Sequence, residues 1–109
     1  MSKFFTALAA ACLLAAWLQP SLAADDRLKR GEMLVERDCA RCHAVGLSGA
    51  SAHKGAPPFR TLSKRYPIES LEEALAEGIV SGHPDMPEFQ YDPDDVGAII
   101  AYLKSIQQR

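Results

Sequence analysis

The segment Cys39-Ala40-Arg41-Cys42-His43 constrains this chain more than any other, because it places two thiols and an imidazole within five residues. On one helical turn, two cysteines three residues apart lie on the same side. Such thiols can add to the two vinyl groups of a haem and form thioethers, and the following histidine is then held beside the iron. The motif therefore predicts one covalently attached haem c, fixed through Cys39 and Cys42 and ligated by His43.

Three other uses of a C-x-x-C pair are less consistent with this sequence. A thioredoxin-like redox pair belongs to a βαβ context, which the chain lacks. A structural zinc site needs four ligands, so His53 or His83 would have to join the cysteines. A disulfide between Cys39 and Cys42 would close a very short loop and stabilise little. Covalent haem attachment is the interpretation that the motif favours.

The N-terminal segment has the pattern of a secretory signal peptide. Lys3 precedes an apolar run over 4–18, and Pro20 and small residues follow it. That run is shorter than the roughly 20 apolar residues of a membrane span. We expect export to the periplasm with cleavage after Ala23 or Ala24, which gives a leader at 1–23 and one domain at 24–109. So small a domain buries a limited core and often needs a disulfide, a metal or a cofactor for stability.

Apolar residues recur at helical spacing and show no strand-like alternation, which predicts an all-α domain of four or so short helices. Ser70 and Glu73 form a capping-box pattern, and Gly78 marks the other end of that helix. Asp92 is the expected N-cap of the last helix, with Pro93 in its first turn. The other helices are expected at 26–38 and 61–65, and loops at 44–58 and 80–91.

From about Leu28 to Gln107 the chain resembles a class I cytochrome c. That family places a glycine eight residues before the first attachment cysteine, where Gly31 stands, so that the first helix can approach the last one closely. Ile99 and Tyr102 match the aliphatic and aromatic pair of the family's last helix. The resemblance implies the class I cytochrome c fold, with short helices wrapped around one haem and with the N- and C-terminal helices crossing.

The same resemblance implies a backbone acceptor for the proximal imidazole. The family carries a G-P-x-L segment whose proline carbonyl accepts a hydrogen bond from the haem-ligating histidine. The corresponding residues here are Ala56-Pro57-Pro58-Phe59. Pro57 is the expected acceptor and Pro58 the alternative. Such a bond fixes the orientation of the ring and raises the basicity of the ligand.

The sixth iron ligand implied by the resemblance is Met86, which stands before Pro87 in the loop upstream of the last helix, as the family's methionine does. A thioether suits haem iron and raises its reduction potential. His83, three residues earlier, is the rival, and an imidazole there would give a lower potential. Met33 belongs to the first predicted helix and is expected to pack or to lie at its surface.

Charge is divided unevenly along the chain. Residues 24–66 contain nine basic and five acidic residues, whereas residues 67–109 contain two basic and nine acidic residues. Such asymmetry gives a dipole that can orient the molecule on a redox partner, although ordinary solvated helix faces would give the same counts. Neither a net basic surface nor basic residues interleaved with aromatic ones are present, so we expect no nucleic-acid partner.

The implied function is that of a periplasmic electron carrier, without enzymatic activity of its own. The expected partners are redox proteins: a dehydrogenase, a bc1-type complex or a terminal oxidase. A haem-bearing, electron-accepting subunit of an exported dehydrogenase complex is the alternative, because both functions need the same domain. After removal of the leader we expect a monomer without a membrane span.

Overall fold

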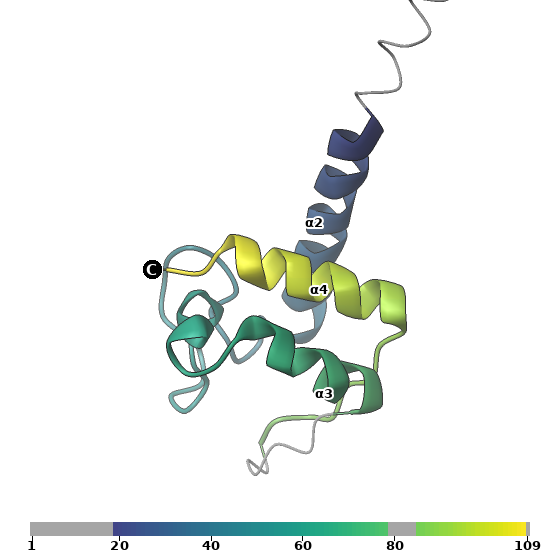
Figure 1. Ribbon diagram of the computed structural model, residues 1–109. Coiled ribbons are helices and arrows are strands. Elements are labelled where there is room, and N and C mark those ends of the chain that lie inside the picture. Colours follow the sequence, from purple (N-terminus) through teal and green to yellow (C-terminus); the bar gives the residue numbers. More distant parts are fainter. Residues whose placement is uncertain (1–18, 79–84, 109) are drawn as a thin grey trace, which may run out of the picture.

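The computed structural model describes residues 19–78 and 85–108, and these form helices and connecting segments only (Figure 1). The leader run at 4–18 and the rival ligand His83 lie outside the described residues. None of the helices in the described part combines the length and the apolar composition of a membrane span. The prediction of an all-α domain is confirmed. In chain order the elements are α2 (Gln19–Asp38), η1 (Phe59–Lys64), η2 (Ile68–Leu71), α3 (Glu72–Glu77) and α4 (Pro93–Ser105), η denoting a 3₁₀ helix.

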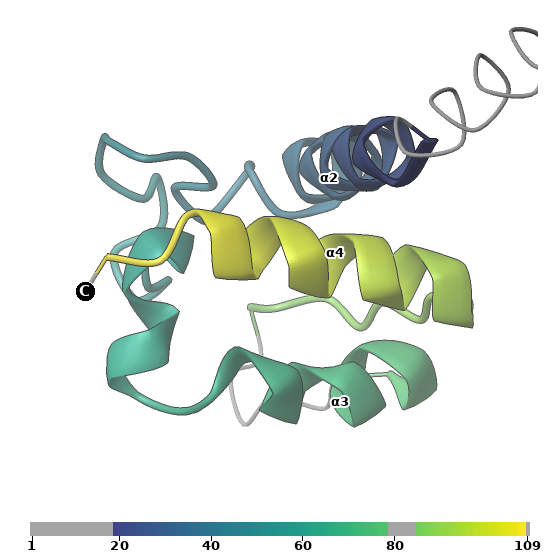
Figure 2. The same cartoon turned by 45° about the horizontal axis from the view of Figure 1, so that its top comes forward.

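The first and last helices cross in close contact, as the resemblance implied (Figures 1 and 2). Gly31 of α2 lies directly on the backbone of α4. A Cβ atom at this position would overlap the carbonyl oxygen of Ala98 and would come within 2.8 Å of the Cβ of Tyr102. A side chain at position 31 would therefore force the two helices apart, which is the physical reason for a glycine here.

The core lies where α2, α4 and the two 3₁₀ helices meet. On α2 the buried face is Gly31, Leu34 and Val35. Within the described ranges the buried side chains are all apolar, apart from the ring of Tyr102 with its hydroxyl. The core cluster consists of Leu34, Val35, Phe59, Leu62, Ile68, Val96, Ile99, Ile100, Tyr102, Leu103 and Ile106.

The last helix begins as predicted. The carboxylate of Asp92 accepts a hydrogen bond from the backbone N–H of Asp95 at 2.9 Å, and Pro93 occupies the first turn. This cap satisfies one of the backbone donors that the first turn of a helix leaves unpaired. Gly78 also ends α3 as predicted, with a φ of 98° that a side chain would disfavour.

Other boundaries differ from the prediction. The expected capping box at Ser70 is wrong: Ser70 lies inside η2, where its N–H donates to the Pro67 carbonyl at 3.0 Å, and α3 begins only at Glu72. Pro67 is the extended residue before η2, and its carbonyl accepts the first hydrogen bond of the 3₁₀ turn, while its missing N–H costs nothing there. The first helix starts at Gln19 instead of 26, and η1 covers 59–64 instead of 61–65.

Candidate haem-binding site

The attachment motif forms a turn that continues from the end of α2. The N–H of Cys39 donates to the carbonyl of Val35 at 2.8 Å, and the N–H of His43 donates to the carbonyl of Cys39 at 2.9 Å. Val35 is 1% exposed and fixes this turn to the core. Cys39, Cys42 and His43 are all half-buried. Two thiols and one imidazole thus come from a single turn whose position is set by α2.

The His43 ring is held on two sides. Its Nδ1 lies 2.8 Å from the carbonyl oxygen of Pro57, and its ring packs against Phe59 with centroids 4.6 Å apart. A carbonyl can only accept, so the proton of this hydrogen bond is on Nδ1 and the lone pair of Nε2 is free to bind a metal. The Pro58 carbonyl accepts instead from the N–H and the hydroxyl of Thr61, at 3.1 and 2.9 Å.

The loop 44–58, which carries Pro57, is folded back onto the motif. The N–H of His53 donates to the carbonyl of Cys42 at 3.0 Å, and the N–H of Phe59 donates to the carbonyl of Ala44 at 2.9 Å. From α4, the hydroxyl of Tyr102 donates to the carbonyl of Val45 at 2.6 Å. These bonds fix both ends of the loop, so the position of the Pro57 carbonyl follows from the fold.

The chemistry of the cysteines fits haem attachment better than the competing uses of the motif. Cys39 and Cys42 are not joined to each other by a disulfide. Burial, with a smaller effect of the Asp38 charge, raises the pKa of Cys39 to about 12. A redox-active C-x-x-C pair needs a lowered pKa, because the thiolate is the nucleophile. Throughout the part of the chain that the structure describes, no three His, Cys, Asp or Glu side chains gather as a zinc site requires. An apolar surrounding with one available imidazole nitrogen suits haem.

The segment 85–91, which carries Met86, is attached to both sides of the motif. The hydroxyl of Tyr91 donates to Oδ2 of Asp38, directly before Cys39, at 2.8 Å. At the other end, Oδ2 of Asp85 lies 3.3 Å from Nε2 of His53. Met86 is half-buried between these contacts. Met33, in contrast, is 61% exposed on α2, so its thioether faces solvent.

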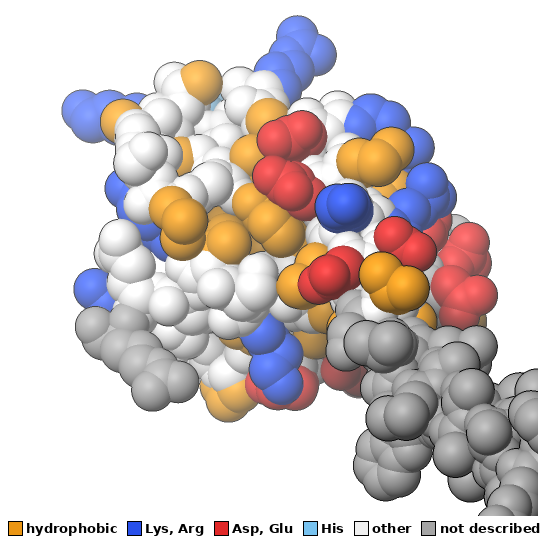
Figure 3. All heavy atoms as spheres, turned by 90° about the horizontal axis from the view of Figure 1, so that it is seen from above, with side chains coloured by type: hydrophobic (Ala, Val, Ile, Leu, Met, Phe, Trp, Pro, Cys, Tyr) orange, Lys and Arg blue, Asp and Glu red, His pale blue; other side chains and the backbone are white. Residues whose placement is uncertain are grey.

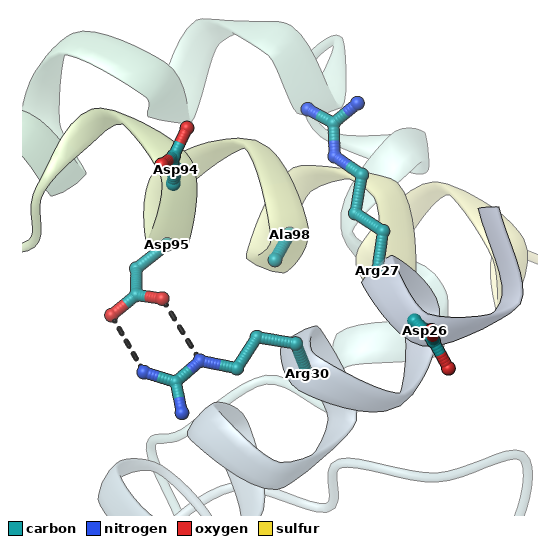
Figure 4. Close-up of a pocket in the computed structure, with 6 residues that line it drawn as sticks. All are labelled: Asp26, Arg27, Arg30, Asp94, Asp95 and Ala98. Atoms are coloured by element: carbon teal, nitrogen blue, oxygen red, sulfur yellow. Dashed lines mark hydrogen bonds and ion pairs between the residues drawn. The ribbon is translucent and has the colours of Figure 1, made fainter. Parts of the chain in front are cut away.

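A charged cavity of about 560 Å³ lies between α2 and α4 and contains none of the predicted site residues (Figure 4). At its edge Arg30 binds Asp95 through two hydrogen bonds of 2.9 and 3.1 Å. The Arg30 guanidinium holds the pKa of Asp95 below its ordinary value. Because the arginine is exposed, the pair contributes little to stability. The cavity is therefore a surface feature of the helix crossing and not the haem site.

The surface charge is mixed on at least one face. Figure 3 shows acidic, basic and apolar side chains interspersed on the face viewed from above. The asymmetry between residues 24–66 and 67–109 is therefore not expressed there as one uniform patch.

Three residues of the site were missed by the sequence analysis. Phe59 carried a signal, because it directly follows the two prolines and occupies the last position of the family's G-P-x-L segment. Asp38 and Tyr91 carried no sequence signal, because these two hydrogen-bonded residues are 53 positions apart.

Comparison with known proteins gives a consistent result. The cytochrome c family profile matches residues 28–107. The chain is 36% identical to cytochrome c-552 of Bradyrhizobium diazoefficiens over 87 residues, which cover 80% of each protein. It is 32% identical over 91 residues to cytochrome c oxidase subunit 2 of Alkalihalophilus pseudofirmus, covering 70% of this chain and 24% of that subunit. The chain thus spans about a quarter of the second relative. No solved structure matches the chain significantly.

Proposed function

This chain belongs to the cytochrome c family, and on that premise we propose that it is an exported single-haem electron carrier with His43 and Met86 as its axial iron ligands. The family binds haem c covalently, and the spacing of Cys39 and Cys42 fits that attachment. The observation that carries the proposal is the fixed imidazole of His43. Its Nδ1 lies 2.8 Å from the Pro57 carbonyl, which leaves Nε2 available beside the two thiols.

Each residue of the attachment turn has a separate task. When bound, haem c supplies a one-electron iron couple. Cys39 and Cys42 hold the cofactor by thioethers, and His43 provides one axial nitrogen. The Pro57 carbonyl keeps the His43 proton on Nδ1 and makes the imidazole a stronger donor. Phe59, 9% exposed, packs on the imidazole and keeps water from that side of the ring.

Met86 is the proposed second axial ligand. Its support is its half-buried position and the two contacts that tie 85–91 to the residues flanking the motif. A soft thioether stabilises ferrous haem and raises the reduction potential. A haem held by both His43 and Met86 would have no open iron position for a substrate. Electron transfer through the haem edge is then the function that this ligand set favours.

Location and partners are inferred from the sequence and the relatives. The leader-like segment at 1–23 supports export to the periplasm. The similarity to an oxidase subunit supports a terminal oxidase as one class of redox partner. The uneven division of charge between the two halves supports docking in a preferred orientation.

The ligand set is tested by spectra of the purified protein and two variants. Methionine sulfur on ferric haem gives a weak charge-transfer band in the red, and the wild-type protein should show it. Met86→Ala should abolish this band, lower the reduction potential and open the iron to external ligands. His83→Ala should leave all three nearly unchanged. If His83→Ala opens the iron and Met86→Ala does not, the site is bis-histidine and the proposed ligand set is wrong.

A further inference from the structure

The segment 85–91 has few hydrogen bonds by which the fold can hold it. It has no regular secondary structure, and it leads from the residues after α3 into the N-cap of α4 (Figure 1). Among the described residues its hydrogen bonds to the rest of the chain are the Asp85–His53 contact, the Tyr91 hydroxyl on Asp38 and the Tyr91 N–H on the Leu75 carbonyl at 2.9 Å. Packing adds to these bonds, because the Tyr91 ring lies against the core and the Glu88 side chain lies against Gly78.

The environment of the Tyr91 hydroxyl makes its contact with Asp38 the stronger of the two side-chain contacts. Asp38 has 13% of its side chain exposed and also accepts two hydrogen bonds of 2.7 Å from Arg37. The Arg37 guanidinium holds the pKa of Asp38 below its ordinary value, and burial raises the pKa of Tyr91. Near neutral pH a neutral phenol therefore donates to a charged carboxylate. Hydrogen bonds with one charged partner are about twice as strong as neutral ones.

The contact at Asp85 is weaker. The two atoms lie 3.3 Å apart, and the side chains of His53 and Asp85 are 44% and 74% exposed. Exposed ion pairs change an equilibrium by less than about fivefold, and salt screens them further. Loss of a hydrogen bond to a charged, partly buried group changes an equilibrium by roughly tenfold to a hundredfold. The C-terminal end of the segment is thus the end that the fold holds firmly.

We propose that Tyr91 is a positioning residue whose hydroxyl, held by Asp38, keeps the segment 85–91 against the attachment turn and so sets how firmly Met86 closes the haem iron. The inference rests on the proposed ligation by Met86. It assigns to Arg37 the task of keeping Asp38 charged and oriented. The same turn that presents Cys39 thereby also holds the segment that carries Met86.

Tyr91→Phe is the test, because it removes the hydroxyl and keeps the ring. In the ferric holoprotein, the apparent affinity for added imidazole should rise about tenfold or more, and the red methionine band should weaken. Tyr102→Phe is the matched control, since it also removes one phenol hydrogen bond, to the Val45 carbonyl at 2.6 Å, but does not touch 85–91. Equal imidazole affinities in the two variants, both folded by circular dichroism, would overturn the proposal.

A pair of substitutions at Asp38 separates positioning from general stability. Asp38→Asn keeps an oxygen that accepts from Tyr91, whereas Asp38→Ala removes the acceptor. Imidazole affinity should be lowest in the wild type, higher in Asp38→Asn and highest in Asp38→Ala. If the asparagine and alanine variants bind imidazole equally tightly, the hydrogen bond does not position the segment.

Amide hydrogen exchange makes failure of this inference distinguishable from failure of the ligand assignment. If the wild-type protein lacks the red band, ligation by Met86 is refuted, but the positioning role of Tyr91 is not. The N–H of residue 91, which donates to the Leu75 carbonyl, should still exchange about tenfold faster in Tyr91→Phe than in Tyr102→Phe. Unchanged exchange at this amide would overturn the positioning role, whichever residue ligates the iron.

Discussion

The two sides of the proposed haem site are built in different ways. On the attachment side, His43 is held by residues close to it in the chain, and its partner Pro57 is 14 positions away. On the methionine side, the contacts join residues 32 and 53 positions apart. The first side is built mainly from one turn and one loop, with one long-range bond from Tyr102 to Val45, whereas both side-chain contacts of the second side are long-range. We therefore expect the methionine side to lose its structure before the attachment side does.

The largest effect should come from the attachment side. Cys42→Ala or His43→Ala should give little stable holoprotein, because a domain this small depends on its cofactor for much of its buried surface. Met86→Ala should still yield a folded protein that keeps haem through acid-organic extraction, since both thioethers remain. Yield, mass and extraction measure this difference. Equal loss of holoprotein in all three variants would show that the two sides are equally essential.

A smaller difference should appear between the phenylalanines of the two sides. Phe59 is 9% exposed and packs on the His43 ring, so Phe59→Ala should lower the free energy of unfolding by about 3 kcal/mol or more. Phe89 is half-buried and stacks on Tyr91 with centroids 6.2 Å apart. Phe89→Ala should cost about 1 kcal/mol, because less apolar area is lost. Denaturant unfolding of both variant holoproteins measures the two losses of stability. A larger loss for Phe89→Ala than for Phe59→Ala would contradict the comparison.

The smallest effects should come from surface charge, which differs between residues 24–66 and 67–109. Replacing Lys64 and Arg65 by Gln should change the rate of electron exchange with anionic hexacyanoferrate a few-fold at low salt. The matched change of Glu72 and Glu73 to Gln should act more on a cationic cobalt complex. Both effects should fade above about 0.15 M salt, where charges are screened within about 8 Å. Rates independent of salt would mean that the charge division is ordinary surface.

Much of the fold was predictable because its signals are local. The N-cap at Asp92 and the stop at Gly78 each depend on one residue and its neighbours, and both are confirmed. The capping box at Ser70 was equally local but wrong, because Pro67 begins a 3₁₀ turn before it. The crossing of α2 with α4 joins distant residues, and only the resemblance around Gly31 made it predictable.

The site divides in the same manner. Spacing alone singled out Cys39, Cys42 and His43, and the roles of these residues stay predictions with a local basis. Pro57 was the expected acceptor and Pro58 the alternative. In the structure the Pro57 carbonyl lies 2.8 Å from Nδ1 of His43, while the Pro58 carbonyl accepts from Thr61 at the start of η1. The bond between Asp38 and Tyr91 had no sequence signal, because a tertiary hydrogen bond leaves no periodicity.

The packing of the first helix on the last one also determines when a newly made chain can fold. Gly31 cannot meet Ala98 and Tyr102 until nearly the whole polypeptide exists. Tyr102 follows Cys42 by 60 positions, and the crossing cannot form until that stretch of chain is present. Until then the core around Val35 is incomplete and both thiols of the motif remain accessible. Because the first helix must pack on the last one, enzymes that modify cysteines can act before folding encloses the two thiols.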